Sequence, residues 1–177
     1  MERDELSGSV FVSQFAQGGI LGLIKLDISN NRIEDIPHTF SRLVLLEDFK
    51  MDNNVLKSLP PNFSRWKLLT TFSPNQNKIS VISHELCTME ALIHLNLSNN
   101  AILELPQSIG RLKNLVRLDC SFNRLCQLPA SLVQLDKLEV LLLIDNCLEL
   151  LPILIGGLAS LKELNLYHNL LEDLPVR

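Results

Sequence analysis

Apolar residues return at fixed places in a unit of 23 residues, and one asparagine marks each unit. The asparagines are Asn31, Asn54, Asn77, Asn100, Asn123, Asn146 and Asn169. If each asparagine is numbered position 9, position 1 is leucine in every unit, and positions 4, 11, 14, 18 and 21 are apolar wherever a unit reaches them. Position 6 is apolar except for Pro74. This period predicts stacked coils, because one coil of this length cannot bury its apolar side alone.

Each unit predicts a short strand. Positions 4 and 6 alternate with neighbours that are polar in most units, the pattern of a strand with one buried face. Strands of stacked coils pair as a parallel sheet, and asparagine at position 9 turns the chain out of the strand while its amide bonds to unpaired backbone groups. We predict an α/β solenoid of seven parallel strands on a concave face. Short helical or 3₁₀ turns and irregular segments form the convex side, and the asparagines form a buried ladder.

The run LxxLxLxxNxLxxLPxxhxxL resembles the leucine-rich repeat in its 23-residue form. Proline follows position 14 in every unit except the third, which has Ser83, and the resemblance covers residues 23–175. It is similar to the intracellular repeats of Ras-suppressor-type proteins and of erbin- and scribble-like scaffolds. The resemblance implies a noncatalytic, cofactor-free module for protein–protein interaction. It implies a cytoplasmic adaptor or scaffold in signalling, with a small GTPase or a phosphatase among the partner classes.

Both ends of the chain differ from the regular units. Residues 1–22 hold a degenerate partial repeat, which we expect to act as an N-terminal cap for a domain over residues 23–177. The seventh repeat of that domain is truncated, and repeat arrays need polar caps to stay soluble. This favours a fragment, a short isoform or end-to-end self-association. In the alternative interpretation, the chain is the regulatory or substrate-recognition region of a larger ligase, kinase or phosphatase.

Composition limits the classes of partner and the cellular compartments that are expected for this chain. A net charge of −4 gives no basic footprint for nucleic acid. The apolar residues are periodic rather than continuous, so we expect no membrane span, and the acidic start of the chain is unlike a signal peptide. Four internal cysteines favour a reducing cytoplasm. Neither spacing nor a neighbouring histidine supports a metal site or a disulfide at Cys126 and Cys147.

Charged residues fall on two predicted surfaces. On the concave face, Lys25 lies beside Asp48 and Asp27 beside Lys50, which predicts charge pairs that each stabilise the sheet by about 0.2–1 kcal/mol. Several basic residues fall on the convex side, where a solvated face is the simpler interpretation and contact with an acidic lipid or partner is the alternative. These residues are Arg42, Arg65, Lys67, Arg111 and Lys113.

The outward strand positions become apolar toward the C-terminus. All three such positions of repeat six are apolar, with aromatic residues on both neighbouring repeats and an arginine at the border. Exposed apolar patches mark interaction sites, and aromatic residues with arginine are typical of binding hot spots. We therefore predict a partner-binding site, with cover by another segment of a longer protein as the alternative. The site consists of Arg117, Phe122, Val140, Leu142, Ile144, Tyr167 and His168.

Two further features carry predictions. Asp145 and His168 share position 8 on neighbouring coils and are expected to pair, with Ser121 nearby. A nucleophile also needs an oxyanion site and a pocket, which an open sheet lacks, so we predict a surface pair and no enzyme activity. Pro74 occupies an inward strand position and cannot donate to the sheet, so we expect strand three to be broken or bulged.

Overall fold

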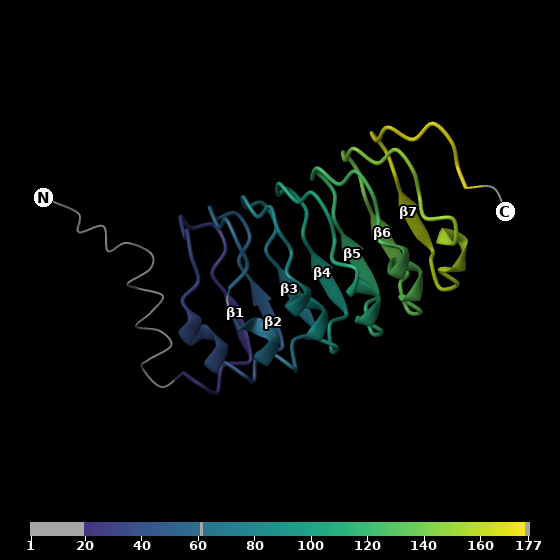
Figure 1. The fold of residues 1–177 in the computed structure, drawn as a ribbon. Helices are drawn as coiled ribbons and strands as arrows, with labels where there is room; N and C mark the ends of the chain where they lie inside the picture. The colour runs from purple at the N-terminus through teal and green to yellow at the C-terminus, as the bar shows by residue number, and fades with distance from the viewer. Residues whose placement is uncertain (1–19, 61, 176–177) are drawn as a thin grey trace, which may run out of the picture.

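A single parallel sheet runs through the molecule in chain order (Figure 1). The computed structural model describes residues 20–60 and 62–175. Its seven strands are β1 (Lys25–Asp27), β2 (Asp48–Lys50), β3 (Thr71–Ser73), β4 (His94–Asn96), β5 (Arg117–Asp119), β6 (Val140–Leu142) and β7 (Glu163–Asn165). The 3₁₀ helices are η1 (His38–Arg42), η2 (Phe63–Arg65), η3 (His84–Thr88), η4 (Ile109–Arg111), η5 (Ala130–Gln134) and η6 (Ile155–Gly157). The predicted α/β leucine-rich-repeat solenoid is confirmed.

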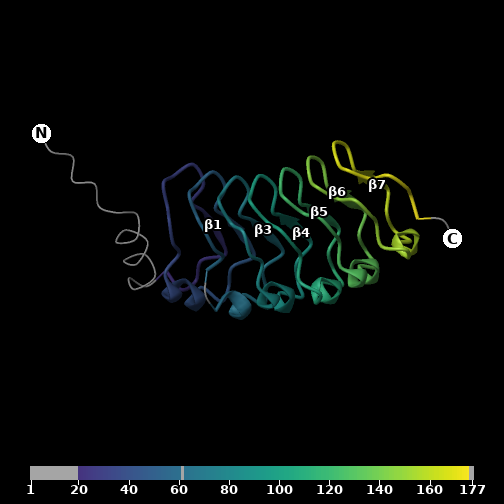
Figure 2. The same ribbon diagram turned by 45° about the horizontal axis from the view of Figure 1, so that its top comes forward.

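The repeat period sets the register of the sheet. Every strand pairs with the next at an offset of one repeat, as in Leu95 opposite Leu118 and Leu118 opposite Leu141. The 3₁₀ helices form a separate row along the solenoid (Figure 2). Each coil therefore places the same repeat position beside its equivalent in the neighbouring coil, and outward side chains form continuous rows across the strands.

The core lies between the sheet and the 3₁₀ helices. Leu118 and Cys120, the inward positions of β5 and its continuation, are fully buried. Aromatic residues fill the core of the second and third repeats, where the rings of Phe49 and Trp66 meet edge to face at 5.2 Å. The Trp66 Nε1 donates a hydrogen bond of 3.1 Å to the Phe40 oxygen. Burial of each large apolar side chain stabilises the fold by about 1.5–3 kcal/mol.

The predicted asparagine ladder is present except at Asn31, which is exposed and bonds only to Ile28 and Ser29 of its own repeat. Asn123 donates from Nδ2 to the oxygens of Cys120 and Ser121 in its own repeat and to Leu97 in the previous one, and its Oδ1 accepts from the nitrogen of Ile102. Asn54, Asn77, Asn100 and Asn146 make the equivalent four bonds. The ladder therefore joins neighbouring coils as well as turning the chain.

The prediction that strand three is broken or bulged at Pro74 is wrong for the strand itself, because β3 has three residues, as every other strand does. Its pairing with β4 is one residue pair shorter than the other strand pairings. Leu97, the equivalent residue in the next repeat, donates from its nitrogen to the oxygen of Asp119 at 2.8 Å. Pro74 has no N–H group and cannot make this bond. Pro74 follows the last residue of the strand, so its effect is confined to one missing hydrogen bond. Its carbonyl oxygen still accepts from the Asn77 and Asn100 side chains.

The charge pairs predicted for the first two repeats do not form salt bridges. Lys25 lies opposite Asp48 and Asp27 opposite Lys50, as expected, but neither pair comes within 4.0 Å in the described part of the chain. Asp27 instead accepts from the nitrogen of Ser29 at 2.9 Å. Hydrogen bonds from Ser29 lower the pKa of Asp27, with a smaller contribution from Lys50. The short carboxylate binds its own backbone in preference to the neighbouring lysine.

Some basic residues of the convex side have structural partners. The Nζ of Lys67 donates to the oxygen of Thr88 at 3.0 Å, at the C-terminal end of η3. Lys113 reaches the oxygen of Gln134 at the end of η5 in the same way. Cations are favourable where a helical segment leaves carbonyl groups unpaired. These two lysines therefore tie coils together.

The expected N-terminal cap lies mostly outside the described residues. Within those residues, the nitrogen of Leu23 donates to the oxygen of Ile20 at 3.1 Å, immediately before the first strand.

None of the helices in residues 20–60 and 62–175 has the length and apolar character needed to cross a membrane.

Candidate partner-binding site

The predicted site is centred on β6, whose outward side chains are apolar. Val140 and Ile144 are partly buried, whereas Leu142 is only 9% exposed. The expectation that Leu142 is an exposed residue is therefore wrong. In the sheet it lies between Asp119 and Asn165, whose side chains share its face and shield it. Leu142 does not belong to the continuous core, unlike Leu141 and Leu143, so it forms the floor of the site.

Two exposed aromatic residues flank Leu142, one on each neighbouring repeat. Phe122 is 49% exposed and Tyr167 is 71% exposed. They belong to the repeats on either side of β6. The nitrogen of Phe122 donates to the oxygen of Ile144 at 2.7 Å, and the nitrogen of Asp145 donates to the oxygen of Tyr167 at 2.9 Å. Backbone bonds therefore fix both aromatic residues to the repeat that carries the floor.

Phe122 also has an unfavourable backbone conformation. Position 8 of every repeat has a positive φ, and all but two of its residues are asparagine, aspartate or histidine. The position 8 residues are Asn30, Asn53, Gln76, Asn99, Phe122, Asp145 and His168. Short polar side chains fit this left-handed region, but phenylalanine at φ 56° is disfavoured by about 1–2 kcal/mol. A strained residue at an exposed place is a reason to look for function there.

Position 7 carries a second departure from the local pattern. Position 7 is polar in the first five repeats, and in some of them its side chain accepts from the backbone of the next repeat, as Ser29 does from Asp52 and Asp52 does from Asn75. Ser121 still accepts from the nitrogen of Ile144 at 3.3 Å. Ile144 has no side-chain acceptor, and the nitrogen of Tyr167 donates to the Asn165 side chain at 3.1 Å, as the nitrogens of Ser98 and Ser121 donate to position 5 of their own repeats. Position 7 thus changes from polar to apolar or aromatic at the site.

Asp145, His168 and Tyr167 form a connected group at the carboxyl end of the strands. The predicted pair is confirmed, because His168 Nδ1 and Asp145 Oδ1 are hydrogen-bonded. The rings of His168 and Tyr167 are stacked, with centroids 5.5 Å apart and planes at 24°. Ser121 is nearly buried and its Oγ accepts from a backbone nitrogen. The group therefore orients Tyr167 and His168 at the surface and does not assemble a nucleophile with a base.

Arg117 borders the floor on the side of repeat five. It lies between His94 and Val140 in the sheet. Its side chain is exposed, and none of the carboxylates in the described ranges lies within 4.0 Å of it. The site residues Arg117, Phe122, Val140, Leu142, Ile144, Tyr167 and His168 thus fall on three consecutive repeats, as expected from their positions.

The cysteines do not gather into a site. Cys87 and Cys120 are buried, and burial raises the pKa of both thiols. Cys126 is exposed and Cys147 is partly exposed, and both have free thiols. Throughout residues 20–60 and 62–175, no group of three or more histidine, cysteine or acidic residues is arranged to hold a metal ion.

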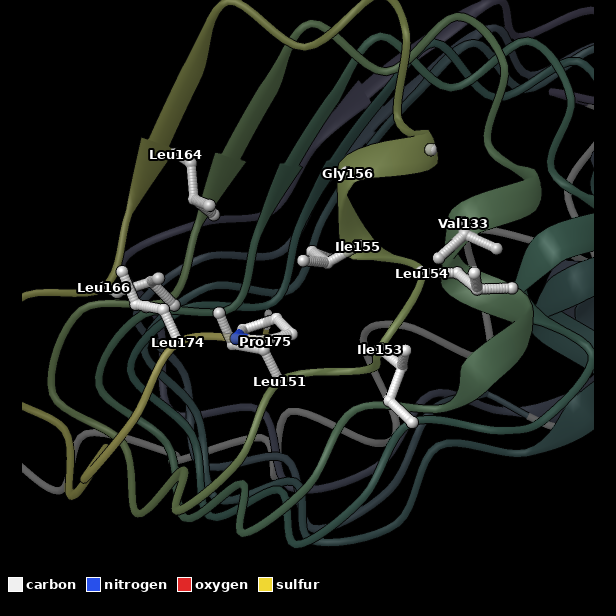
Figure 3. A pocket seen from close by; sticks show the side chains of 11 residues that line it. Val133, Leu151, Ile153, Leu154, Ile155, Gly156, Leu164, Leu166, Leu174 and Pro175 are labelled. Carbon is white, nitrogen blue, oxygen red and sulfur yellow. The ribbon is translucent and has the colours of Figure 1, made fainter. Parts of the chain in front are cut away.

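An apolar hollow that is open to solvent lies at the last coil, between β7 and η6 (Figure 3). It has a volume of about 800 Å³ and is lined by Leu151, Ile155, Leu164, Leu166 and Leu174 among others. Leu164 is 39% exposed, although equivalent residues in earlier repeats are buried. The last coil has a described neighbour on one side only, which leaves its inward residues open.

The strain at Phe122 is the feature that sequence reasoning missed. Its signal was available, since asparagine recurs at position 8 in the first, second and fourth repeats. Such a preference points to a backbone with positive φ. The same signal marks Gln76, which lies outside the site.

Family models match two parts of the chain. A model described as leucine-rich repeat region matches residues 76–174, and one described as Leucine Rich Repeat matches residues 22–43. A comparison with curated proteins gave no match.

Solved leucine-rich-repeat structures resemble nearly the whole chain. A leucine-rich-repeat protein of Leptospira interrogans is 32% identical with a TM-score of 0.85, over 92% of this chain and 41% of that one. An internalin of Listeria monocytogenes is 25% identical with a TM-score of 0.80, over 92% of this chain and 46% of that one. The Arabidopsis receptor kinase HAESA, solved with the peptide hormone IDA and a co-receptor, is 30% identical with a TM-score of 0.75. That match covers 84% of this chain and 26% of HAESA. The chain thus spans less than half the length of each.

Proposed function

Because this chain belongs to the leucine-rich-repeat family, a fold of protein–protein interaction modules, we propose that it binds a protein partner through the concave face of repeats five to seven. We assign binding to residues 23–177 and the role of an N-terminal cap to residues 1–22. The HAESA structure holds a peptide hormone, which supports a polypeptide ligand for this fold.

One observation carries the proposal. Phe122 occupies a left-handed backbone position, which is unfavourable for phenylalanine. Ile144 and Tyr167 occupy position 7, which is polar in the first five repeats. Together the three residues place apolar and aromatic groups on one surface. Interfaces concentrate their energy in such side chains, so partner binding explains why the three occur together.

We further propose that the protein is a noncatalytic cytoplasmic adaptor or scaffold, with a role in small-GTPase signalling. Free thiols at all four cysteines and the proline that follows position 14 in most repeats support this setting. Both features match the intracellular repeats that the sequence resembles. A phosphatase is the other partner class suggested by this resemblance.

A second candidate function is the noncatalytic region of a larger enzyme. The observation that favours it is the similarity to the receptor kinase HAESA, since this chain covers 26% of the solved HAESA chain. In that case the same concave site would recognise a substrate or a regulator for a catalytic domain elsewhere in the polypeptide. Both candidates require binding at repeats five to seven.

The proposal is tested by affinity capture from a cell lysate with three immobilised proteins. These are the wild type, Ile144→Asp at the site, and Lys50→Ala on the same face of repeat two. We expect one or more polypeptides to be retained by the wild type and Lys50→Ala and lost with Ile144→Asp. Circular dichroism melts establish that all three remain folded. Equal retention by Ile144→Asp and the wild type would contradict the assigned site.

A further inference from the structure

A row of three outward residues crosses the end of the site. In the sheet, Arg117 lies directly beside Val140, and Val140 lies beside Glu163. Arg117 and Glu163 are exposed and Val140 is partly buried. Two strand spacings separate the outer members, a distance of about 10 Å. The row therefore presents a cation, an apolar side chain and an anion in a straight line.

Neither charge in this row is used inside the protein. Within the described part of the chain, Arg117 and Glu163 have no oppositely charged group within 4.0 Å. Lys162, next to Glu163, pairs instead with Glu139 at 2.8 Å. The two outer charges of the row are available to a ligand. They differ in this from Asp145 and His168, which already bind each other.

The backbone beside the row offers little to a ligand. The nitrogen of Cys120 donates to the oxygen of Leu142, and the nitrogen of Leu143 donates to the oxygen of Asn165, both at 2.9 Å. A ligand therefore cannot add as another strand inside the sheet, the mode in which main-chain hydrogen bonds supply affinity. Recognition must therefore come from side chains, and the unpaired charges of Arg117 and Glu163 determine which ligand charges are favoured.

The spacing of the row fits a helix better than an extended peptide. Residues i and i+7 of a helix lie about 10.5 Å apart on one face, with i+3 and i+4 between them. Residues on one face of an extended strand recur at about 6.7 Å and then 13.4 Å, so neither spacing matches. A helix lying across the strands would set a residue against each member of the row at the same time.

We propose that the site binds a helical segment of a partner protein that carries an acidic residue at i, an apolar residue at i+3 or i+4, and a basic residue at i+7. The acidic side chain pairs with Arg117, the apolar one packs on Val140 above the floor at Leu142, and the basic one pairs with Glu163. This inference rests on the proposed function and adds the chemistry of the partner. Electrostatic complementarity of this kind mainly provides specificity.

A displayed library of helical peptides randomised at i, i+3, i+4 and i+7 tests the proposal. It is selected on the wild type, Arg117→Glu, Glu163→Arg, the double variant Arg117→Glu/Glu163→Arg, and Lys25→Glu. Lys25 is the matched control, because it is an exposed cation at the same position of repeat one. A further selection on Ile144→Asp shows whether the peptides bind at the apolar site of repeat six.

We expect the wild type and Lys25→Glu to enrich peptides with one acidic and one basic end. Arg117→Glu should enrich peptides with two basic ends, Glu163→Arg peptides with two acidic ends, and the double variant should restore the mixed pattern. The affinities of matched and mismatched peptides should differ between about threefold and tenfold at low ionic strength.

The selections on Arg117→Glu and Ile144→Asp distinguish a failure of the charged row from a failure of binding at the site. If peptides fail to bind Ile144→Asp, but those selected on Arg117→Glu carry the same charges as those selected on the wild type, the peptide site stands and only recognition by the charged row is overturned. Enrichment that persists on Ile144→Asp, or the enrichment of no peptide at all by the wild type, overturns peptide binding at this site and the inference with it.

Discussion

The side-chain amide of Asn123 donates a hydrogen bond of 3.0 Å to the carbonyl oxygen of Leu97 in the preceding coil. Since Asn123 is nearly buried, removal of its amide leaves buried backbone groups without partners. We expect Asn123→Leu to lower the free energy of unfolding by about 1–3 kcal/mol, measured by urea denaturation. Asn96→Leu is the control, because the Asn96 Oδ1 bonds only to Ser98 in its own coil. Equal losses would show that the ladder does not join the coils.

Close packing between η4 and η5 requires glycine at position 110. A Cβ added there would lie 2.4 Å from the carbonyl oxygen of Ser131, whereas one added at Gly156 would have no atom within 4 Å. We therefore expect Gly110→Ala to destabilise the fold by about 1–3 kcal/mol and Gly156→Ala to leave it within about 0.5 kcal/mol. Thermal melts of the two variants compare them directly. A Gly110→Ala protein as stable as Gly156→Ala would contradict the packing at this contact.

Phe122 gives a prediction in which stability and binding change in opposite directions. Asparagine occupies the equivalent left-handed position in several other repeats, so Phe122→Asn should stabilise the fold by about 1 kcal/mol. The same change removes an exposed aromatic side chain from the site and should weaken binding at least tenfold. The reverse change, Asn99→Phe, should destabilise the fold without affecting binding. A Phe122→Asn protein that binds as well as the wild type would mean that the aromatic ring has no role in recognition.

Asp52 predicts a dependence of stability on pH. Burial raises its pKa despite the opposing hydrogen bonds from Ser73 and Asn75. A raised pKa means that the folded state holds the proton more tightly than the unfolded state does, so this group's contribution to stability is complete below its unfolded pKa and is lost as the pH rises through its folded pKa.

Asp52→Asn tests this dependence, since its amide oxygen can still accept from Ser73 Oγ and the Asn75 nitrogen, which lie 2.6 Å and 2.9 Å from the Asp52 Oδ1. Measured between pH 3 and 7, the stability of Asp52→Asn relative to the wild type should increase with pH. A stability of Asp52→Asn relative to the wild type that decreases as the pH rises would show that the carboxylate is favoured in the folded state.

The regular features of the fold could be predicted because they repeat. Period, strand positions and the asparagine ladder each appear several times in the sequence, so chance departures do not obscure them. The effect of Pro74 is smaller than predicted because its position relative to the end of the strand decides how many hydrogen bonds it removes. The charge pairs of Lys25 and Asp27 are absent because register brings charges side by side but does not decide whether a carboxylate binds the neighbouring lysine or its own backbone.

The site could be predicted only in part. Alternation along β6 identified Val140, Leu142 and Ile144 as outward residues, and the structure places them on one face. How far each is covered depends on the side chains of the adjacent strands, and this is why Leu142 is 9% exposed rather than open. The strain at Phe122 depends on a backbone torsion, which a periodic pattern of apolar residues does not report.

Binding by the C-terminal part of the concave face is tested most directly by titration calorimetry of a captured partner with Tyr167→Ala and Lys50→Ala. Tyr167 is 71% exposed, so its truncation should leave the fold intact, and a hot-spot residue of this kind contributes about 2 kcal/mol or more to binding. We predict that Tyr167→Ala weakens binding about thirtyfold and that Lys50→Ala changes it less than about twofold. Unchanged binding by Tyr167→Ala together with a large loss for Lys50→Ala would place the site at the opposite end of the sheet.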